Sequence, residues 1–257
     1  MELNLSNKRA LVCGGSKGIG GAIAKALSKE GVSVTMVARN EAELQAQLSS
    51  LAGSGHQVMV ADFSNPDDVN RVCEYVRQQN MDIVVNNTGG PPPGPIVEAT
   101  LDQFESAMNM HLKASHQIMQ AAVSHMKNQR FGRFINVIST SVKIPIKGLG
   151  VSNTTRGAMA SWSKTLSNEL APFGITVNNI LPGAISTTRL DAIIANTAEK
   201  SGVSKEESTN AMKSTIPAGR IGEPEEMASL ATFLASEKAS YITGVSIPVD
   251  GGRTGSL

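Results

Sequence analysis

The sequence predicts a single-domain α/β fold, in which a doubly wound parallel sheet of seven strands carries helices on both faces. Short apolar runs alternate along the chain with segments of helical periodicity. Connections of ten or more residues join most of the runs, as parallel pairing requires. The runs are also nearly continuously apolar, which is typical of strands covered on both faces.

The bulk composition fits one such domain and excludes several classes of partner. The chain has 257 residues, of which 40% are hydrophobic, enough for a substantial core. Its formal net charge of +1 argues against a nucleic-acid partner. Cys13 and Cys73 are too few for a disulfide framework, and the N-terminal segment has no apolar stretch typical of a signal peptide or membrane anchor. We expect a cytoplasmic protein with a small-molecule substrate and no membrane partner.

The first part of the chain alternates regularly between the two kinds of element. The segment 18–31 has apolar residues at helical spacing and ends at a glycine, and the segment 66–80 opens with a proline at a first-turn position. The strands predicted here are 9–13, 32–38, 56–62 and 82–87, and the helices are 18–31, 41–52 and 66–80.

The second part has longer helices and one irregular segment. Strands are predicted at 133–139, 175–181 and 244–252, and helical regions at about 101–129 and 152–171. The segment 184–222 is polar and helix-prone, and it follows the sixth strand. Ligands bind such sheets at the carboxyl ends of the strands, so we expect this segment to form a lid there.

A glycine-rich turn, "CGGSKGIG" (13–20), connects the first strand to the first helix. Gly14, Gly18 and Gly20 allow a sharp turn, the approach of a pyrophosphate to the backbone, and close packing of helix on strand. A phosphate at the following helix N-terminus would be stabilised by its unpaired N–H groups. The turn therefore predicts a dinucleotide site.

Four motifs in order give the chain a specific resemblance. They are "CGGSKGIG" (13–20), "NNTG" (86–89), "PGAIST" (182–187) and "YITGVSIPVDGG" (241–252). With them, nearly the full chain resembles the short-chain dehydrogenase/reductase family, and most generally its 3-oxoacyl-carrier-protein reductases. The resemblance implies a Rossmann-type fold, the NAD(P)-dependent interconversion of a carbonyl and an alcohol, and a homo-oligomer, either dimer or tetramer.

The second strand indicates which dinucleotide is bound. A carboxylate at its end would accept hydrogen bonds from the adenosine ribose and select NAD, but Arg39 stands in this region. A guanidinium can bind a 2′-phosphate with two hydrogen bonds, and Lys17 in the glycine-rich turn is a second nearby cation. We therefore predict NADP(H) over NAD(H), the alternative being two solvated surface cations.

The resemblance assigns further cofactor contacts to residues that follow the strands. Asp62 resembles the acid that contacts adenine, Asn86 and Gly89 mark the segment beside the ribose, and Thr187 resembles the hydroxyl that binds the nicotinamide carboxamide. No metal site is predicted. The predicted cofactor-binding residues are Gly14, Ser16, Lys17, Gly18, Ile19, Gly20, Arg39, Asp62, Phe63, Asn87, Gly89, Arg156, Pro182, Gly183, Ile185 and Thr187.

The catalytic positions depart from the family pattern of Ser, Tyr, Lys and Asn. Ser139 keeps the serine at the end of the fifth strand, 13 residues before Ser152, which occupies the tyrosine position. Arg156 stands at the lysine position and His111 at the asparagine position. We predict that these four residues form the catalytic constellation.

The substitutions leave the source of a proton open. A serine hydroxyl is a far weaker acid than a phenol, and Arg156, with a side-chain pKa above about 12, stays protonated. Arg156 can still bind the nicotinamide ribose and stabilise a developing alkoxide. His111, with an unperturbed pKa of about 6.5, is the one suitable group; it either passes a proton through a water or is structural.

Three functions remain open at this point. The first is a divergent NADP-dependent oxidoreductase of the 3-oxoacyl reductase type. The second is a catalytically impaired NADP-binding regulator or an inactive subunit on the same scaffold. The third is a redox-neutral reaction, such as dehydration or isomerisation.

Overall fold

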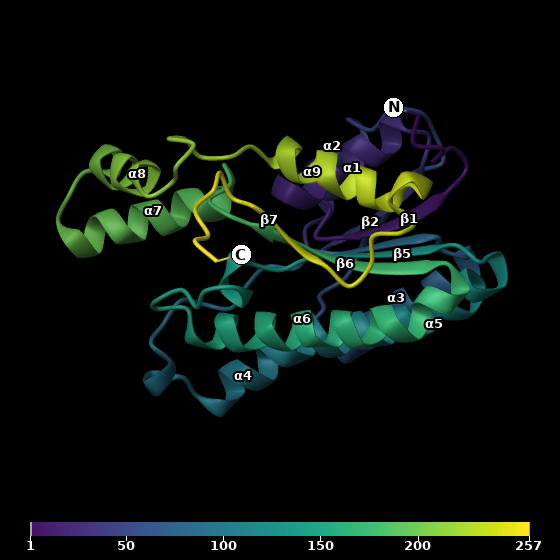
Figure 1. Cartoon of the computed structure of the whole chain (residues 1–257), viewed down its shortest axis with the longest axis horizontal. Coiled ribbons are helices and arrows are strands. Elements are labelled where there is room, and N and C mark those ends of the chain that lie inside the picture. The colour runs from purple at the N-terminus through teal and green to yellow at the C-terminus, as the bar shows by residue number, and fades with distance from the viewer. Residues whose placement is uncertain (1, 257) are drawn as a thin grey trace.

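One parallel sheet runs through the centre of the molecule and has helices on both faces (Figure 1). The computed structural model describes residues 2–256. The seven strands follow the order β3-β2-β1-β4-β5-β6-β7, and every neighbouring pair is parallel, so the predicted fold class is confirmed. The strands are β1 (Arg9–Cys13), β2 (Ser33–Ala38), β3 (Gln57–Val60), β4 (Ile83–Asn86), β5 (Gly132–Val137), β6 (Ile175–Pro182) and β7 (Ser246–Val249).

The helices form two layers. In Figure 1, α1, α2 and α9 lie on one side of the sheet, α3, α5 and α6 on the other, and the pair α7 and α8 extends beyond the sheet. The α-helices are α1 (Gly18–Lys29), α2 (Glu41–Leu48), α3 (Pro66–Gln79), α4 (Leu101–Met108), α5 (Ala114–Gln129), α6 (Gly150–Leu170), α7 (Thr188–Ser201), α8 (Lys205–Ser214) and α9 (Pro224–Ala235). Short 3-10 turns occupy Ile96–Glu98, Thr140–Val142, Ala171–Phe173 and Glu237–Ala239.

Alternate residues of β1, an interior strand, contribute to two separate cores. Ala10 and Val12 of β1 are buried with the α1 and α9 side chains, whereas Leu11 and Cys13 are buried with those of α3 and α5. Successive strand side chains point to opposite faces, so an apolar strand supplies both cores at once. This double burial stabilises the sheet, and the parallel pairing of its strands places their carboxyl ends at one edge.

Three elements differ from the sequence prediction. The single helix predicted at 101–129 is α4 and α5 joined by a π-helical turn, Asn109–Lys113, and the strand predicted at 244–252 is limited to β7 because a turn begins at Asp250. Helix α9 was not predicted, although its buried apolar face packs against α1. The described residues contain no helix with the length and apolar character needed to cross a bilayer.

A row of polar side chains crosses four strands of the sheet. Asn86, Asn136, Asn179 and Ser246 lie directly opposite one another in the strand register. Each amide nitrogen donates to the next side-chain oxygen, at 2.8 Å from Asn86 to Asn136, 3.1 Å from Asn136 to Asn179 and 3.0 Å from Asn179 to Ser246. Burying these amides is tolerated because they satisfy one another.

Candidate active site

The predicted site residues come together at the carboxyl edge of the sheet. The glycine-rich turn follows β1, the segment Asn87–Gly90 follows β4, Ser139 follows β5, and Thr187 follows β6. In a doubly wound sheet this edge is where ligands bind. The parallel strand order thus brings segments far apart in sequence to one place.

The glycine-rich turn is shaped to receive an anion. Gly14 and Gly18 have positive φ angles of 61° and 55°, and a Cβ on Gly20 would lie 2.1 Å from the Gly14 carbonyl oxygen. Lys17 is the N-cap of α1 but makes no side-chain capping bond. The first N–H groups of α1 are therefore left without a side-chain cap, as in phosphate-binding turns.

Two neighbouring loops lie against this turn. Asn87 Nδ2 donates to the carbonyl oxygens of Gly14 at 3.3 Å and Cys13 at 3.4 Å. Thr187 lies on the other side, since a Cβ on Gly18 would come within 3.3 Å of its methyl group. Thr187 Oγ1 also accepts from Leu190 N and so caps α7. Segments that follow β1, β4 and β6 therefore lie together at this turn.

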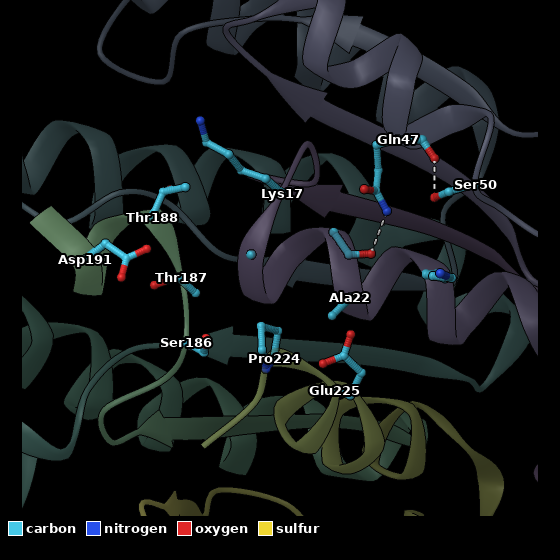
Figure 2. Close-up of a pocket in the computed structure, with 13 residues that line it drawn as sticks. Lys17, Ala22, Gln47, Ser50, Ser186, Thr187, Thr188, Asp191, Pro224 and Glu225 are labelled. Atoms are coloured by element: carbon cyan, nitrogen blue, oxygen red, sulfur yellow. Dashed lines mark hydrogen bonds between the residues drawn. The ribbon is translucent and has the colours of Figure 1, made fainter. Parts of the chain in front are cut away.

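A groove of about 530 Å³ runs along the outer side of the same turn. Its lining includes Lys17 and Gly18 from the turn and side chains from α1, α2, α7 and α9. Figure 2 shows Thr188 and Asp191 on one side of it, and Pro224 and Glu225 on another. The lining includes the predicted cofactor residues Lys17, Gly18 and Thr187 but none of the four predicted catalytic residues.

Glu43 is a residue that the sequence analysis missed. Its carboxylate accepts from Lys17 Nζ at 2.6 Å and from Ser16 Oγ at 3.1 Å. The hydrogen bond from Lys17 lowers the pKa of Glu43, which stays ionised at neutral pH. Asn40 is the residue in the sequence that could have indicated Glu43. It is the N-cap of α2 and accepts a hydrogen bond from the Glu43 N–H. This cap places Glu43 in the first turn of α2, beside the glycine-rich turn.

Arg39 is the more accessible of the two cations predicted for the 2′-phosphate. Its side chain is 76% exposed, and its Nη1 lies 3.8 Å from Asp62 Oδ2, a distant ion pair. Asp62 is engaged mainly with Ser64, whose N–H and Oγ both donate to Asp62 Oδ1. The Arg39 guanidinium therefore keeps most of its donors for a ligand.

Arg156 lies at the centre of the site. It is 7% exposed, and it donates to the carbonyl oxygens of Val137 at 3.2 Å and Thr88 at 3.4 Å. Burial, and then the charge of Arg189, lower the pKa of Arg156 to about 10, so the guanidinium remains a fixed cation at neutral pH. Its two bonds connect α6 to the ends of β4 and β5.

The two predicted serines differ in their surroundings. Ser139 Oγ accepts from Ser141 N at 3.0 Å, which leaves the hydroxyl proton for a ligand. Ser152 lies buried near the start of α6, and its hydroxyl makes no hydrogen bond to the described residues. Neither tyrosine replaces the missing phenol, because Tyr75 bonds to Thr35 on β2 and Tyr241 is fully exposed before β7.

His111 is a neutral, buried imidazole. It lies in the π-helical turn with 2% exposure, its Nδ1 bonds to Thr88 Oγ1, and its Nε2 has no partner among the described residues. Burial, followed by the charges of Arg156 and Arg189, lowers the pKa of His111 to about 2. The ordinary histidine pKa on which the proton-transfer hypothesis relied therefore does not hold here.

Arg189 is a second residue that the sequence analysis missed. It lies in the first turn of α7, and its Nη1 donates to the Gly90 carbonyl oxygen at 3.1 Å. It follows the "PGAIST" motif by two residues, and this position was the only sequence signal. Arg189 brings a second guanidinium close enough to affect both His111 and Arg156.

Known proteins match nearly the whole chain. Residues 14–254 match the family described as enoyl-(acyl carrier protein) reductase. The chain belongs to the short-chain dehydrogenase/reductase family. The NADPH-dependent reductase BacG of Bacillus subtilis (strain 168) is 32% identical over 98% of this chain and 100% of its own length. The 3-oxoacyl-[acyl-carrier-protein] reductase FabG of Vibrio cholerae is 32% identical over 97% of this chain and 98% of its own length.

Solved structures of the short-chain dehydrogenase/reductase family agree in fold. The L-sorbose reductase of Gluconobacter frateurii, complexed with NADPH and L-sorbose, covers 100% of both chains with 30% identity and a TM-score of 0.94. YwfH, an NADPH-dependent reductase involved in bacilysin biosynthesis, has a TM-score of 0.91 at 31% identity and covers 98% of this chain and 100% of its own. These descriptions agree with the NADP(H) preference predicted from Arg39 and Lys17.

The remaining predicted cofactor contacts of this family member lie along the same edge. Gly183 N donates to Val249 O at 3.0 Å, and Ile185 pairs with Gly222 in an isolated bridge. Gly89 faces open space, whereas the Phe63 side chain lies in the core, so only the Phe63 backbone is available to a ligand. Among residues 2–256, no cluster of His, Cys, Asp or Glu has a metal-binding arrangement.

Proposed function

We propose that this chain is an NADP-dependent oxidoreductase that reduces the carbonyl of a small molecule to an alcohol. The observation that carries the proposal is the position of Arg156. It is a buried cation fixed between the ends of β4 and β5, on the strand edge that also carries the glycine-rich turn and Ser139. A fixed positive charge beside a reacting carbonyl lowers the energy of the negative oxygen that forms during reduction.

The cofactor site divides into three parts on this proposal. The α1 N-terminus and its glycines hold the pyrophosphate, Arg39 and Lys17 hold the 2′-phosphate, and Thr187 holds the nicotinamide carboxamide. NADPH, when bound, supplies the hydride. The segment 184–222, which contains α7 and α8, serves as a lid that excludes water from the reacting groups.

Ser139 and Arg156 both interact with the substrate oxygen. Ser139 donates its hydroxyl proton in a hydrogen bond to the carbonyl oxygen and so polarises the bond, and Arg156 stabilises the alkoxide. Ser152 is too weak an acid to protonate the alkoxide, and His111 is neutral at neutral pH. The alkoxide therefore takes its proton from water, without a protein acid.

A turnover screen with NADPH tests the proposal. Wild-type protein should oxidise NADPH in the presence of some members of a panel of ketones and oxo acids, and Arg156→Met should lower kcat/KM by about a hundredfold or more. Ser152→Tyr combined with Arg156→Lys rebuilds the family pair and should raise the rate. Wild type that binds NADPH but reduces nothing, beside a double variant that reduces ketones, would overturn the proposal.

The replacement of the family's tyrosine and asparagine by Ser152 and His111 favours a second candidate function, an NADP-binding protein without turnover. Ser152 lacks an acidic proton, and the pKa of His111 is about 2, so no described side chain of the constellation is a ready proton donor. Under this candidate the protein would act as a regulator or an inactive subunit. The wild-type arm of the turnover screen separates the two functions.

We also propose that the protein works in the cytoplasm as a homodimer or homotetramer. Members of the family commonly form such oligomers, and Val97 and Leu101 are large apolar side chains that are 90% and 79% exposed. Contact with a second copy would remove this apolar surface from water. Sedimentation equilibrium at several concentrations would reveal the oligomer, and a monomer throughout would contradict it.

A further inference from the structure

Two arginines from different helices meet at the segment after β4. Arg156 of α6 donates to the carbonyl oxygen of Thr88, and Arg189 of α7 donates to that of Gly90, two residues further along. Within residues 2–256 neither arginine takes part in an ion pair. Carbonyl dipoles, and no carboxylate, are thus their only described partners.

Their charges act on the same small volume. The guanidiniums of Arg156 and Arg189 both lower the pKa of His111, and Arg189 also lowers that of Arg156. Arg156 is buried whereas Arg189 lies exposed at the surface, so the two like charges repel each other with partial screening by water. Each guanidinium has five N–H groups, and most of them are not used by the backbone carbonyls. An anion between the two arginines would relieve the repulsion and accept these bonds.

His111 adds a buried ring nitrogen that also lacks a partner. Its Nδ1 is occupied by the Thr88 hydroxyl, and its Nε2 makes no bond to the described residues despite 2% exposure. When Thr88 donates to Nδ1, the Nε2 atom carries the proton. A buried N–H without an acceptor is costly, so in this tautomer Nε2 indicates a missing acceptor.

We propose that Arg156 and Arg189, assisted by the Nε2–H of His111, form a subsite for a carboxylate of the substrate. The proposal rests on the proposed function and narrows its substrate class to small oxo acids. A carboxylate matches the planar fork of a guanidinium and can accept from several donors at once.

The position of the two arginines favours the substrate over the cofactor phosphates. The pyrophosphate would lie at the glycine-rich turn, which Asn87 contacts. The two arginines instead donate to the carbonyl oxygens of Thr88 and Gly90, which follow Asn87 in the chain. Arg156 also contacts Val137, two residues before Ser139. The pair therefore lies beside the residue that we expect to hold the reacting carbonyl.

Calorimetry on the NADPH-saturated protein tests the subsite with two probes of similar shape. Phenylacetate should bind, and its neutral counterpart phenylacetamide should bind about tenfold more weakly or worse, because only the former carries a charge. Arg189→Gln should weaken the binding of phenylacetate by about tenfold and leave the binding of phenylacetamide and of NADPH unchanged. Lys200→Gln is the matched control, because it removes one exposed charge from the same helix, and it should change neither probe.

Each other outcome has a distinct meaning. Equal binding of the two probes, or equal effects of Arg189→Gln and Lys200→Gln, would overturn the subsite. Competition between phenylacetate and NADPH, with Arg189→Gln weakening both, would assign the arginines to the cofactor phosphates and also overturn it. If NADPH does not bind at all, the proposed function fails, and the phenylacetate titration of the free protein then tests the subsite by itself.

Discussion

Glu43 holds the side chain of Lys17, one of the two cations that we propose for the 2′-phosphate. The carboxylate holds Lys17 Nζ at 2.6 Å and Ser16 Oγ at 3.1 Å, and both partners belong to the glycine-rich turn. The pair is solvent-exposed, so its net contribution is small and salt-dependent. A bound phosphate would therefore displace Glu43 from Lys17, at a modest cost in affinity.

Glu43→Gln should tighten NADPH binding. The substitution releases Lys17 and removes a negative charge near the 2′-phosphate, so the Kd for NADPH should fall about two- to fivefold while that for NADH stays unchanged. Fluorescence titration at low salt measures both constants. Glu41→Gln, which changes an exposed carboxylate of the same helix turn, is the control. Weaker NADPH binding in Glu43→Gln would show that Glu43 supports the site instead of competing with it.

The π-helical turn between α4 and α5 determines the chemistry of His111. The extra residue in this turn cannot be read from the helical periodicity, which predicts one continuous helix over this region. The turn directs His111 inward, next to Thr88 and two guanidinium charges, where the imidazole stays neutral. Its pKa of about 2 results from this tertiary environment, which the local sequence does not report.

Acid should destabilise the protein partly through His111. The unfolded chain protonates this imidazole near a pKa of about 6.5, whereas the pKa in the folded state is about 2, so stability falls as the pH drops below about 6.5. Between pH 6.5 and about pH 5 the loss from this group is about 2 kcal/mol.

Urea unfolding at about pH 7.5 and about pH 5 measures this effect. From about pH 7.5 to about pH 5, the free energy of unfolding of His111→Asn should fall by about 2 kcal/mol less than that of wild type. This holds even if the variant is less stable at both pH values. His116→Asn, at an exposed position of α5, should lose as much as wild type. An unchanged pH dependence in His111→Asn would refute the buried neutral imidazole.

Arg133 connects three parts of the molecule at the edge opposite the site. Its buried guanidinium donates to the carbonyl oxygens of Gly132 and Gly174, which lie at the starts of β5 and β6. Its Nε and Nη2 both donate to Ser236 O, at the end of α9, and the guanidinium stacks 4.2 Å from the Phe131 ring centroid. One side chain therefore holds the last helix to the centre of the sheet.

Arg133→Met should lower the free energy of unfolding by about 3–5 kcal/mol, because three carbonyl groups lose their charged donor. Arg130→Met is the control, since that exposed arginine makes a single bond, to Pro172 O. It should cost about 1 kcal/mol or less. Thermal unfolding of both variants measures the two effects. Equal decreases in melting temperature would show that Arg133 does not connect these elements.

The sheet and the glycine-rich turn could be predicted because their signals are local. Apolar runs such as β1 are buried on both faces, and glycines with positive φ, such as Gly14, mark the turn directly. Glu43 and Arg189 escaped the sequence analysis because they reach the site only once the strands are ordered. Helix α9 was missed because its partners on α1 lie almost two hundred residues away in the chain.

The most direct test of an NADP(H)-dependent reductase is a fluorescence titration of the wild-type chain with NADPH and NADH. Arg39 is exposed and has only a distant carboxylate beside it, so it is available to the 2′-phosphate that distinguishes the two cofactors. NADPH should bind at least about tenfold more tightly than NADH, and Arg39→Ala should remove most of that difference. Equal affinities of the wild-type protein for the two cofactors would contradict the assignment.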